Sequence, residues 1–325
     1  MAFIFNIYIT RSQDERKYFY DLISFIKENN ASNLKIIHLV FRYNQVVKNL
    51  KFHNTKINAN IYTFNPYVVK NSVIYNLNDI INLFKTNKQI DKSIFMYTGH
   101  SNGMYLCKSK IRPFRIEDFC EIVNTVLNGK KADLIIYDCC LCGNINCLSV
   151  NYDYTKYVIA STSYQSYESM LMTKAIYKEG KIDIAFCKNI INDVIDLEIH
   201  QTDTYKSNFV LYELNDSFLQ FMNIVLMYKD TFKDKGNYVI DLPIYKDLEC
   251  CLKNINFDYS TFVKYQRLDK NECKNYKKRG KGSNTPIPSK ILIILKRPIR
   301  ENLHTKGDLF LRNFTSSVNT SGFIK

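Results

Sequence analysis

The middle of the chain reads Leu134-Ile135-Ile136-Tyr137-Asp138-Cys139-Cys140-Leu141-Cys142-Gly143, an apolar run that ends abruptly in polar, reactive and small residues. Short apolar runs bounded in this way are typical of strands that are buried on both faces. Comparable runs lie at Phe3–Ile9, Leu34–Phe41, Ile61–Phe64, Ser93–Tyr97 and Tyr157–Ala160. Because such runs alternate with segments of helical periodicity, the sequence predicts an α/β fold, with a mostly parallel central sheet and helices on both faces.

Helices are predicted between these strands and after them. A capping box at Ser12–Glu15 precedes apolar residues at helical spacing over Tyr18–Ile26. Further helical patterns cover Leu77–Phe84, Arg115–Leu127, Ile182–Val194, Ser217–Tyr228 and Tyr245–Ile255, and late strands are expected at Phe209–Tyr212 and Ile291–Leu295. We therefore expect a first domain over residues 1–235 and a smaller C-terminal region over residues 236–325 that packs on it.

Composition excludes several classes of protein. The 325 residues are 46% hydrophobic and 23% charged, with 10 Gly and 6 Pro, which argues against a disordered, collagen-like or coiled-coil chain. The net charge of +14 is concentrated, because the segment from Lys264 to Arg300 holds twelve Lys or Arg and two Asp or Glu. A basic segment of this kind suits an anionic partner, although a solvated loop is its usual meaning.

The cysteines and the first residues indicate a reducing compartment. Ten cysteines in a chain of this length do not make a small disulfide scaffold, and the opening Met1–Thr10 has no basic leader or small-residue cleavage site. No apolar stretch reaches the ~20 residues that a membrane-spanning helix needs. We expect a cytoplasmic protein with free thiols and no membrane contact.

Two of the predicted strands end in residues that can react. Phe95-Met96-Tyr97-Thr98-Gly99-His100-Ser101-Asn102-Gly103 follows one strand, and Asp138–Gly143 follows the next. Reactive groups in such sheets lie at the carboxyl ends of the strands. A Cys and a His on neighbouring strand ends suit nucleophilic catalysis, in which a thiolate attacks a carbonyl carbon and an imidazole manages the proton.

These two segments resemble the clostripain-like cysteine peptidases, relatives of caspases, gingipains and legumains. Members share an apolar strand that ends in His, then an apolar strand that ends in Asp-x-Cys-Leu, here Phe95–His100 and Leu134–Leu141. A following Ala-Ser strand is matched by Tyr157–Ser161, and the resemblance covers about residues 1 to 230. It implies a caspase-like three-layer sandwich and a cysteine endopeptidase, a hydrolase that needs no cofactor. Some relatives use calcium, but no loop here has an EF-hand pattern.

The resemblance assigns catalytic roles. Cys140 is the nucleophile, His100 is the general acid and base, and backbone N–H groups of Gly103 and Cys140 form the oxyanion hole. The family has Gly directly after the His, where this chain has Ser101, and it has a Trp after the Ala-Ser strand, whereas this chain has none. A catalytically inactive homologue is therefore an alternative.

The resemblance also assigns a preference for substrates. The Asp of Asp-x-Cys lines the pocket for the residue before the cut, so Asp138 would select Lys or Arg in a protein or peptide substrate. Ser161 is assigned to substrate binding with it. Glu168, on the loop after the Ala-Ser strand, is a candidate second carboxylate for the same pocket, and a solvated surface Glu is the alternative. Relatives can cleave themselves between the His and the Cys, and self-cleavage in this interval, which contains Lys108, Lys110, Lys130 and Lys131, is a hypothesis for this chain.

Three other functions compete with the peptidase. Gly99–Gly103 fits the Gly-x-Ser-x-Gly elbow of α/β-hydrolases, which would make Ser101 the nucleophile. The basic segment 264–300 could bind nucleic acid. Cys139, Cys142 and Cys147 are close enough to suggest zinc, but the sequence has no second Cys-x-x-Cys to complete the site, and we expect no metal.

Overall fold

The computed structural model describes the parts of the chain that form the sheet and the helices on it. These are residues 2–10, 34–42, 57–64, 68–74, 77–84, 90–107, 113–163, 173–178, 180–199, 208–228, 245–252, 255, 257–267 and 290–294, with positions 24, 28, 230 and 232. Within the predicted helix over Tyr18–Ile26 the structure describes one residue, Ser24, and it is helical; the other residues of this prediction lie outside the described ones. No helix in these segments is long and apolar enough to cross a membrane.

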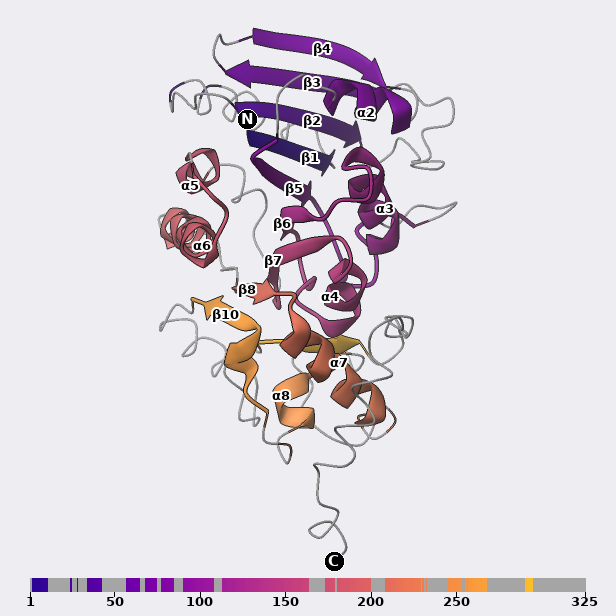
Figure 1. Cartoon of the computed structure of the whole chain (residues 1–325), viewed down its shortest axis with the longest axis vertical. Coiled ribbons are helices and arrows are strands. Elements are labelled where there is room, and N and C mark those ends of the chain that lie inside the picture. Colours follow the sequence, from indigo (N-terminus) through magenta and orange to yellow (C-terminus); the bar gives the residue numbers. More distant parts are fainter. Residues whose placement is uncertain are drawn as a thin grey trace, which may run out of the picture.

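A nine-stranded sheet forms the middle of the molecule (Figure 1). Its strand order is β10-β8-β7-β6-β5-β1-β2-β3-β4. The strands are β1 (Ala2–Thr10), β2 (Leu34–Arg42), β3 (Ile57–Phe64), β4 (Val68–Ile74), β5 (Lys92–Thr98), β6 (Ala132–Asp138), β7 (Thr155–Ser161), β8 (Phe209–Glu213) and β10 (Val263–Gln266). The five central strands β2, β1, β5, β6 and β7 are parallel, and the outer strands pair antiparallel.

Side chains of the central strands alternate between two apolar cores. On β6, Ile135 and Tyr137 face one core and Leu134 and Ile136 face the other, and all four are buried. This two-residue alternation is the periodicity of a strand with both faces covered. The predicted caspase-like three-layer α/β fold, with a parallel centre, is confirmed.

Helices cover both faces (Figure 1). One face packs on α2, α3, α4 and α7, and the other packs on α5 and α6. The helices are α2 (Leu77–Phe84), α3 (Ile116–Val126), α4 (Ile145–Asn151), α5 (Lys174–Tyr177), α6 (Ile184–Ile199), α7 (Asp216–Tyr228) and α8 (Leu248–Cys251). The helical patterns over 77–84, 115–127, 182–194 and 217–228 are thereby confirmed.

The helix predicted over Tyr245–Ile255 is wrong for most of its length. Tyr245–Asp247 forms strand β9, which pairs antiparallel with β11 (Leu292–Ile294), and the helix α8 that follows has four residues. Pairing with a segment some 45 residues further along the chain supplies backbone hydrogen bonds that the local pattern does not reveal. The late strand expected at Ile291–Leu295 is present as β11.

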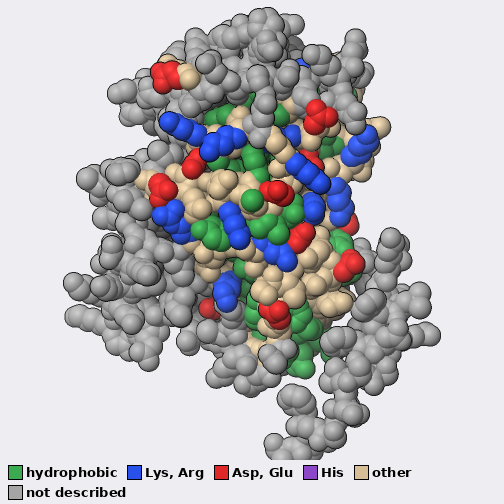
Figure 2. Space-filling model, turned by 60° about the vertical axis from the view of Figure 1, so that its left-hand side comes forward, with side chains coloured by type: hydrophobic (Ala, Val, Ile, Leu, Met, Phe, Trp, Pro, Cys, Tyr) green, Lys and Arg blue, Asp and Glu red, His purple; other side chains and the backbone are tan. Residues whose placement is uncertain are grey.

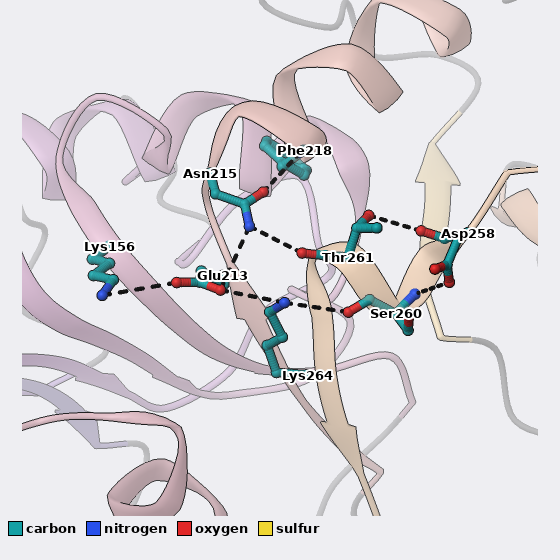
Figure 3. A network of polar contacts seen from close by, with 8 residues as sticks. All are labelled: Lys156, Glu213, Asn215, Phe218, Asp258, Ser260, Thr261 and Lys264. Atoms are coloured by element: carbon teal, nitrogen blue, oxygen red, sulfur yellow. Dashed lines mark hydrogen bonds and ion pairs between the residues drawn. The ribbon is translucent and has the colours of Figure 1, made fainter.

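The described residues after position 236 add one strand to the large sheet and pack on the same core as the preceding chain. Strand β10 pairs with β8, and the ring of Phe262 lies 4.9 Å from that of Phe221 on α7. Figure 3 shows the polar contacts beside this junction. Lys264 Nζ forms an ion pair with Glu213 Oε2 at 3.4 Å, and Asn215 Nδ2 donates to the carbonyl of Thr261 at 2.9 Å.

Replacing Phe262 with Ala tests this shared core. The side chain is fully buried among four aromatic rings, so its loss leaves a cavity and lowers the free energy of unfolding by about 3–5 kcal/mol. Lys264→Ala removes a partly exposed ion pair next to it and costs under about 1 kcal/mol. Urea unfolding followed by circular dichroism measures both; equal midpoints for F262A and the wild type would contradict the shared core.

A buried histidine links the fold to pH. His38 on β2 accepts a hydrogen bond from Asn6 Nδ2 at 3.1 Å, and Thr98 donates to Asn6 Oδ1 at 3.2 Å. Burial lowers the pKa of His38 from 6.5 to about 3. The unfolded chain therefore binds this proton at a pH where the folded chain does not, and the folded state loses stability as the pH falls from about 6.5 toward 3.

Between pH 7 and pH 5 this linkage amounts to about 2 kcal/mol of unfolding free energy, at ~1.4 kcal/mol per pH unit below the unfolded pKa. The Gln side chain of the His38→Gln variant does not titrate in this range. The free energy of unfolding of this variant should therefore fall by about 2 kcal/mol less than that of the wild type between pH 7 and pH 5. Urea unfolding of both proteins at the two pH values measures the difference. An equal fall in the free energy of unfolding of both proteins would show that protonation of His38 does not cause the pH dependence of stability.

Candidate active site

The pairing of β5 with β6 brings the two reactive segments together. The strands are parallel neighbours in the register Ile94↔Leu134 to Thr98↔Asp138, and the Gly99 N–H donates to the Asp138 carbonyl at 3.2 Å. His100 and Cys140 each lie two residues beyond this last pair. Adjacent strands are ~4.8 Å apart, so both residues leave the same edge of the sheet side by side. The prediction that they follow neighbouring strands is confirmed.

Cys140 differs from its neighbours in exposure. Among the cysteines whose side chains the structure describes, Cys140 is partly exposed and all the others are buried. Burial raises the pKa of Cys139 well above its usual range, and that of Cys187 to about 12. A buried thiol of raised pKa supplies little thiolate, which makes Cys140 the thiol best placed to react.

The turn after Cys140 is tied to the end of β7. The Leu141 N–H donates to the Ser163 carbonyl at 3.1 Å, and the Gly143 N–H donates to the Ser161 carbonyl at 2.7 Å. Leu141 has φ 63°, a left-handed conformation that costs a non-glycine residue about 1–2 kcal/mol. The two hydrogen bonds to β7 hold this strained turn in place.

The histidine segment is held by Tyr97 and Ser101. Tyr97 Oη lies 3.0 Å from the His100 carbonyl oxygen and also contacts the carbonyl of Leu106. The Gly103 N–H donates to Ser101 Oγ at 2.9 Å, and Ser101 Oγ lies 3.3 Å from Cys142 Sγ. The predicted oxyanion donor Gly103 is thus engaged with Ser101 in this state, and Ser101 links the two reactive segments.

The residues predicted to bind substrate lie at the neighbouring strand ends. Asp138 ends β6 and is 1% exposed. Ser161 ends β7, where it is buried and its hydroxyl contacts the backbone and side chain of Ser163. Glu168 lies outside the described residues. Lys130 and Lys131, in the interval where relatives cleave themselves, are exposed on the turn between α3 and β6.

The geometry contradicts a nucleophile elbow at Ser101. An elbow runs from a strand directly into a long helix. Here residues 101–107 are not helical, Cys107 and Phe114 form an isolated bridge, and the next helix among the described residues, α3, begins at Ile116. The serine-hydrolase alternative therefore lacks the local structure that it requires.

The described part of the molecule gives little support to a metal or nucleic-acid site. It contains no group of three or more His, Cys, Asp or Glu side chains placed to hold a metal ion. Of the basic segment, residues 264–267 and 290–294 are described, and Arg267 Nη2 lies 2.7 Å from Asp196 Oδ1. On the face shown in Figure 2, Lys and Arg side chains are interspersed with Asp and Glu.

Sequence reasoning missed several residues that shape the site. The strand pattern predicts Tyr97 as a core residue, and the sequence motifs give no role to Ser163 or Asn144. Asn144 caps α4, because its Oδ1 accepts the Cys147 N–H at 2.8 Å. An Asn directly before an apolar helical run is a helix-start signal, so this cap was readable from the sequence.

Gly143→Ala tests the fixed turn. A Cβ at this position would lie 2.5 Å from Thr162 Cγ2 and 2.9 Å from Tyr212 Oη, so the turn must shift away from β7. We expect a loss of about 1–3 kcal/mol in unfolding free energy. Gly129→Ala, where a Cβ meets nothing within 4 Å but φ is +81°, gives the cost of backbone strain alone. A G143A variant as stable as the wild type would contradict the tight packing of this turn.

Comparison with solved structures shows which proteins share this architecture. A secreted C11 cysteine protease from Bacteroides thetaiotaomicron, iotapain, aligns with a TM-score of 0.62 over 90% of this chain and 93% of its own, at 14% identity. An inactive zymogen C11 protease from Parabacteroides distasonis aligns with a TM-score of 0.57 over 91% and 92%, at 11% identity.

A further structure of a secreted B. thetaiotaomicron C11 protease, in complex with an irreversible peptide inhibitor, aligns over 97% of each chain with a TM-score of 0.58 and 11% identity. No known protein-family model matches the sequence, and no curated protein is similar to it at a significant level. The likeness is therefore one of structure, and the chain has the caspase-like α/β fold of the C11, or clostripain-like, cysteine proteases.

Proposed function

We propose that the chain is a cysteine endopeptidase that cleaves proteins or peptides after Lys or Arg. The observation that carries this proposal is the β5–β6 register, which puts His100 and the partly exposed Cys140 two residues beyond the same ladder pair. The fold shared with C11 proteases over nine-tenths of the chain supports the same class of reaction. No other described thiol combines exposure with a histidine on the neighbouring strand end.

Catalysis follows the chemistry of a thiol and an imidazole. The Cys140 thiolate attacks the carbonyl carbon of the scissile bond, and the imidazolium of His100 gives its proton to the leaving amine. The resulting thioester is hydrolysed by a water molecule, whose proton His100 accepts. Tyr97 contributes by fixing the backbone of His100 through the carbonyl oxygen.

The oxyanion needs backbone donors at the two strand ends. The N–H groups of Cys140 and Gly103 are proposed for this role, and one such donor is typically worth ~3–4 kcal/mol in the transition state. The Gly103 N–H donates to Ser101 Oγ in the resting chain, so it reaches the oxyanion only after the Ser101 hydroxyl turns away. An enzyme with Gly at position 101 would not have to make this movement.

Asp138 is proposed to select the basic side chain. Its carboxylate is almost completely buried at the end of β6, two residues from Cys140. A buried carboxylate gains strongly from a cationic hydrogen-bond donor, which a substrate Lys or Arg would supply. Because the Asp138 carboxylate is buried, a substrate side chain reaches it only after neighbouring protein atoms move aside. Ser161, at the adjacent end of β7, would line the same part of the pocket.

A panel of fluorogenic peptides with Lys, Arg, Asp or Asn before the scissile bond tests the proposal. We expect hydrolysis of the Lys and Arg peptides, a loss of at least about 10³-fold in kcat for Cys140→Ala and His100→Ala, and retained activity for Ser101→Ala. Asp138→Asn should lower kcat/KM for the basic peptides by about 10²-fold or more.

Each unexpected result of the peptide panel would contradict a different part of the proposal. Hydrolysis of the Asp peptide alone would refute the selection of Lys or Arg by Asp138, while the peptidase function would stand. Activity that survives C140A and is lost in S101A would replace the cysteine mechanism with a serine mechanism. An absence of hydrolysis across the panel, with Cys140 reactive toward alkylating agents, would identify a catalytically inactive homologue.

A further inference from the structure

One buried amide joins the two segments that carry His100 and Cys140. Asn144 is fully buried, and its Nδ2 donates to the carbonyl of Leu141 at 2.6 Å and to the carbonyl of Gly103 at 3.3 Å. Its Oδ1 accepts the Cys147 N–H at the start of α4. A single side chain thus contacts the turn after the cysteine, the loop after the histidine and the first turn of a helix.

The three contacts require an amide in one orientation. Two partners are carbonyl oxygens that need a donor, and the third is an N–H that needs an acceptor. An Asn side chain offers two N–H donors and one carbonyl acceptor in the same plane. An ionised Asp would place an oxygen against two carbonyls, and a Ser hydroxyl could cap the helix but could not reach all three groups.

The two carbonyls lie on the segments that directly follow the reactive residues. Leu141 follows Cys140 directly, and its strained backbone is held at the N–H by Ser163 and at the carbonyl by Asn144. Gly103 is held at its N–H by Ser101 and at its carbonyl by Asn144. Loss of the amide would release both segments at once, although the β5–β6 ladder below them would remain.

We infer that Asn144 is a positioning residue, which sets the separation of the Cys140 thiol and the His100 imidazole by hydrogen-bonding to both of their loops. The inference rests on the proposed peptidase function and adds a residue outside the Cys–His pair. Misplacement by about 1 Å costs on the order of 10²-fold in rate. Substrate binding depends on other residues, so kcat should fall while KM stays nearly constant.

Asn144→Ser tests the inference, because Ser caps a helix about as well as Asn does. Asn215→Ser is the matched control. Asn215 also caps a helix, by accepting the Phe218 N–H at 3.1 Å, and also donates to a distant carbonyl, that of Thr261 (Figure 3). It therefore has the same local chemistry on α7, away from the β5 and β6 strand ends.

We expect N144S to lower kcat on the Lys or Arg peptide by about 10²-fold with KM within about threefold, and N215S to leave both unchanged. Urea midpoints of both variants show how far each is destabilised. Should N144S fail to fold, Asn144→Gly takes its place with the same expectation, because Gly at the start of a helix costs only a few tenths of a kcal/mol relative to Asn. Equal kcat values in wild type and N144S would overturn the inference, as would equal losses in N144S and N215S.

A second readout keeps the test independent of peptidase activity. The rate of alkylation of Cys140 by iodoacetamide at pH 7, followed by peptide mass spectrometry, reports the thiolate that a nearby imidazole stabilises. We expect about a tenfold slower rate in N144S and no change in N215S. If the wild type hydrolyses no peptide but N144S is still alkylated more slowly, the peptidase function is refuted and the positioning role of Asn144 is retained. Equal alkylation rates in the wild type and N144S would refute the positioning role.

Discussion

The parallel hydrogen-bonded ladder between β5 and β6 is the constraint on which the site depends. Strands in parallel register deliver the residues that follow them to one edge of the sheet, and here the last ladder pair is Thr98 and Asp138. The ladder persists because all of β5, and all of β6 except the partly exposed Asp133, is buried between two layers of helices, where unpaired backbone groups would be costly. The reactive residues at this edge therefore follow directly from buried, hydrogen-bonded strands.

The loops beyond the ladder are ordered by a different means. Backbone groups of the turn after Cys140 pair with the end of β7, and the loop after His100 is held by Tyr97, Ser101 and Asn144. Each contact is a single hydrogen bond, typically worth ~1 kcal/mol net, but together they fix two segments that have no secondary structure of their own. The strained backbone at Leu141 is tolerated within this set of contacts.

The sequence was a good guide wherever one local pattern dominated. The buried central strands and the helices α2, α3, α6 and α7 could be read from periodicity, because burial on both faces leaves an uninterrupted run such as Leu134–Tyr137. The short helices α4 and α5 were not predicted. Edge strands were harder to read. Val68–Ile74 carries Lys70 and Asn71 and reads as polar, and Val263–Gln266 is stabilised by pairing with β8, some 50 residues earlier in the chain. The contacts of Asn144 and the left-handed turn at Leu141 are set by tertiary structure, since Leu rarely adopts positive φ and Gly103 is 41 residues from Asn144.

The proposed peptidase requires the Cys140 thiol and the His100 imidazole to act on one substrate carbonyl. The most direct measurement is a crystal structure of the chain after reaction with a peptidyl acyloxymethyl ketone that carries Lys at the reactive position. The account predicts a thioether on Cys140 Sγ, with the His100 ring in contact with the adduct. An adduct on another cysteine, or a His100 ring that points away from the bound inhibitor, would contradict it.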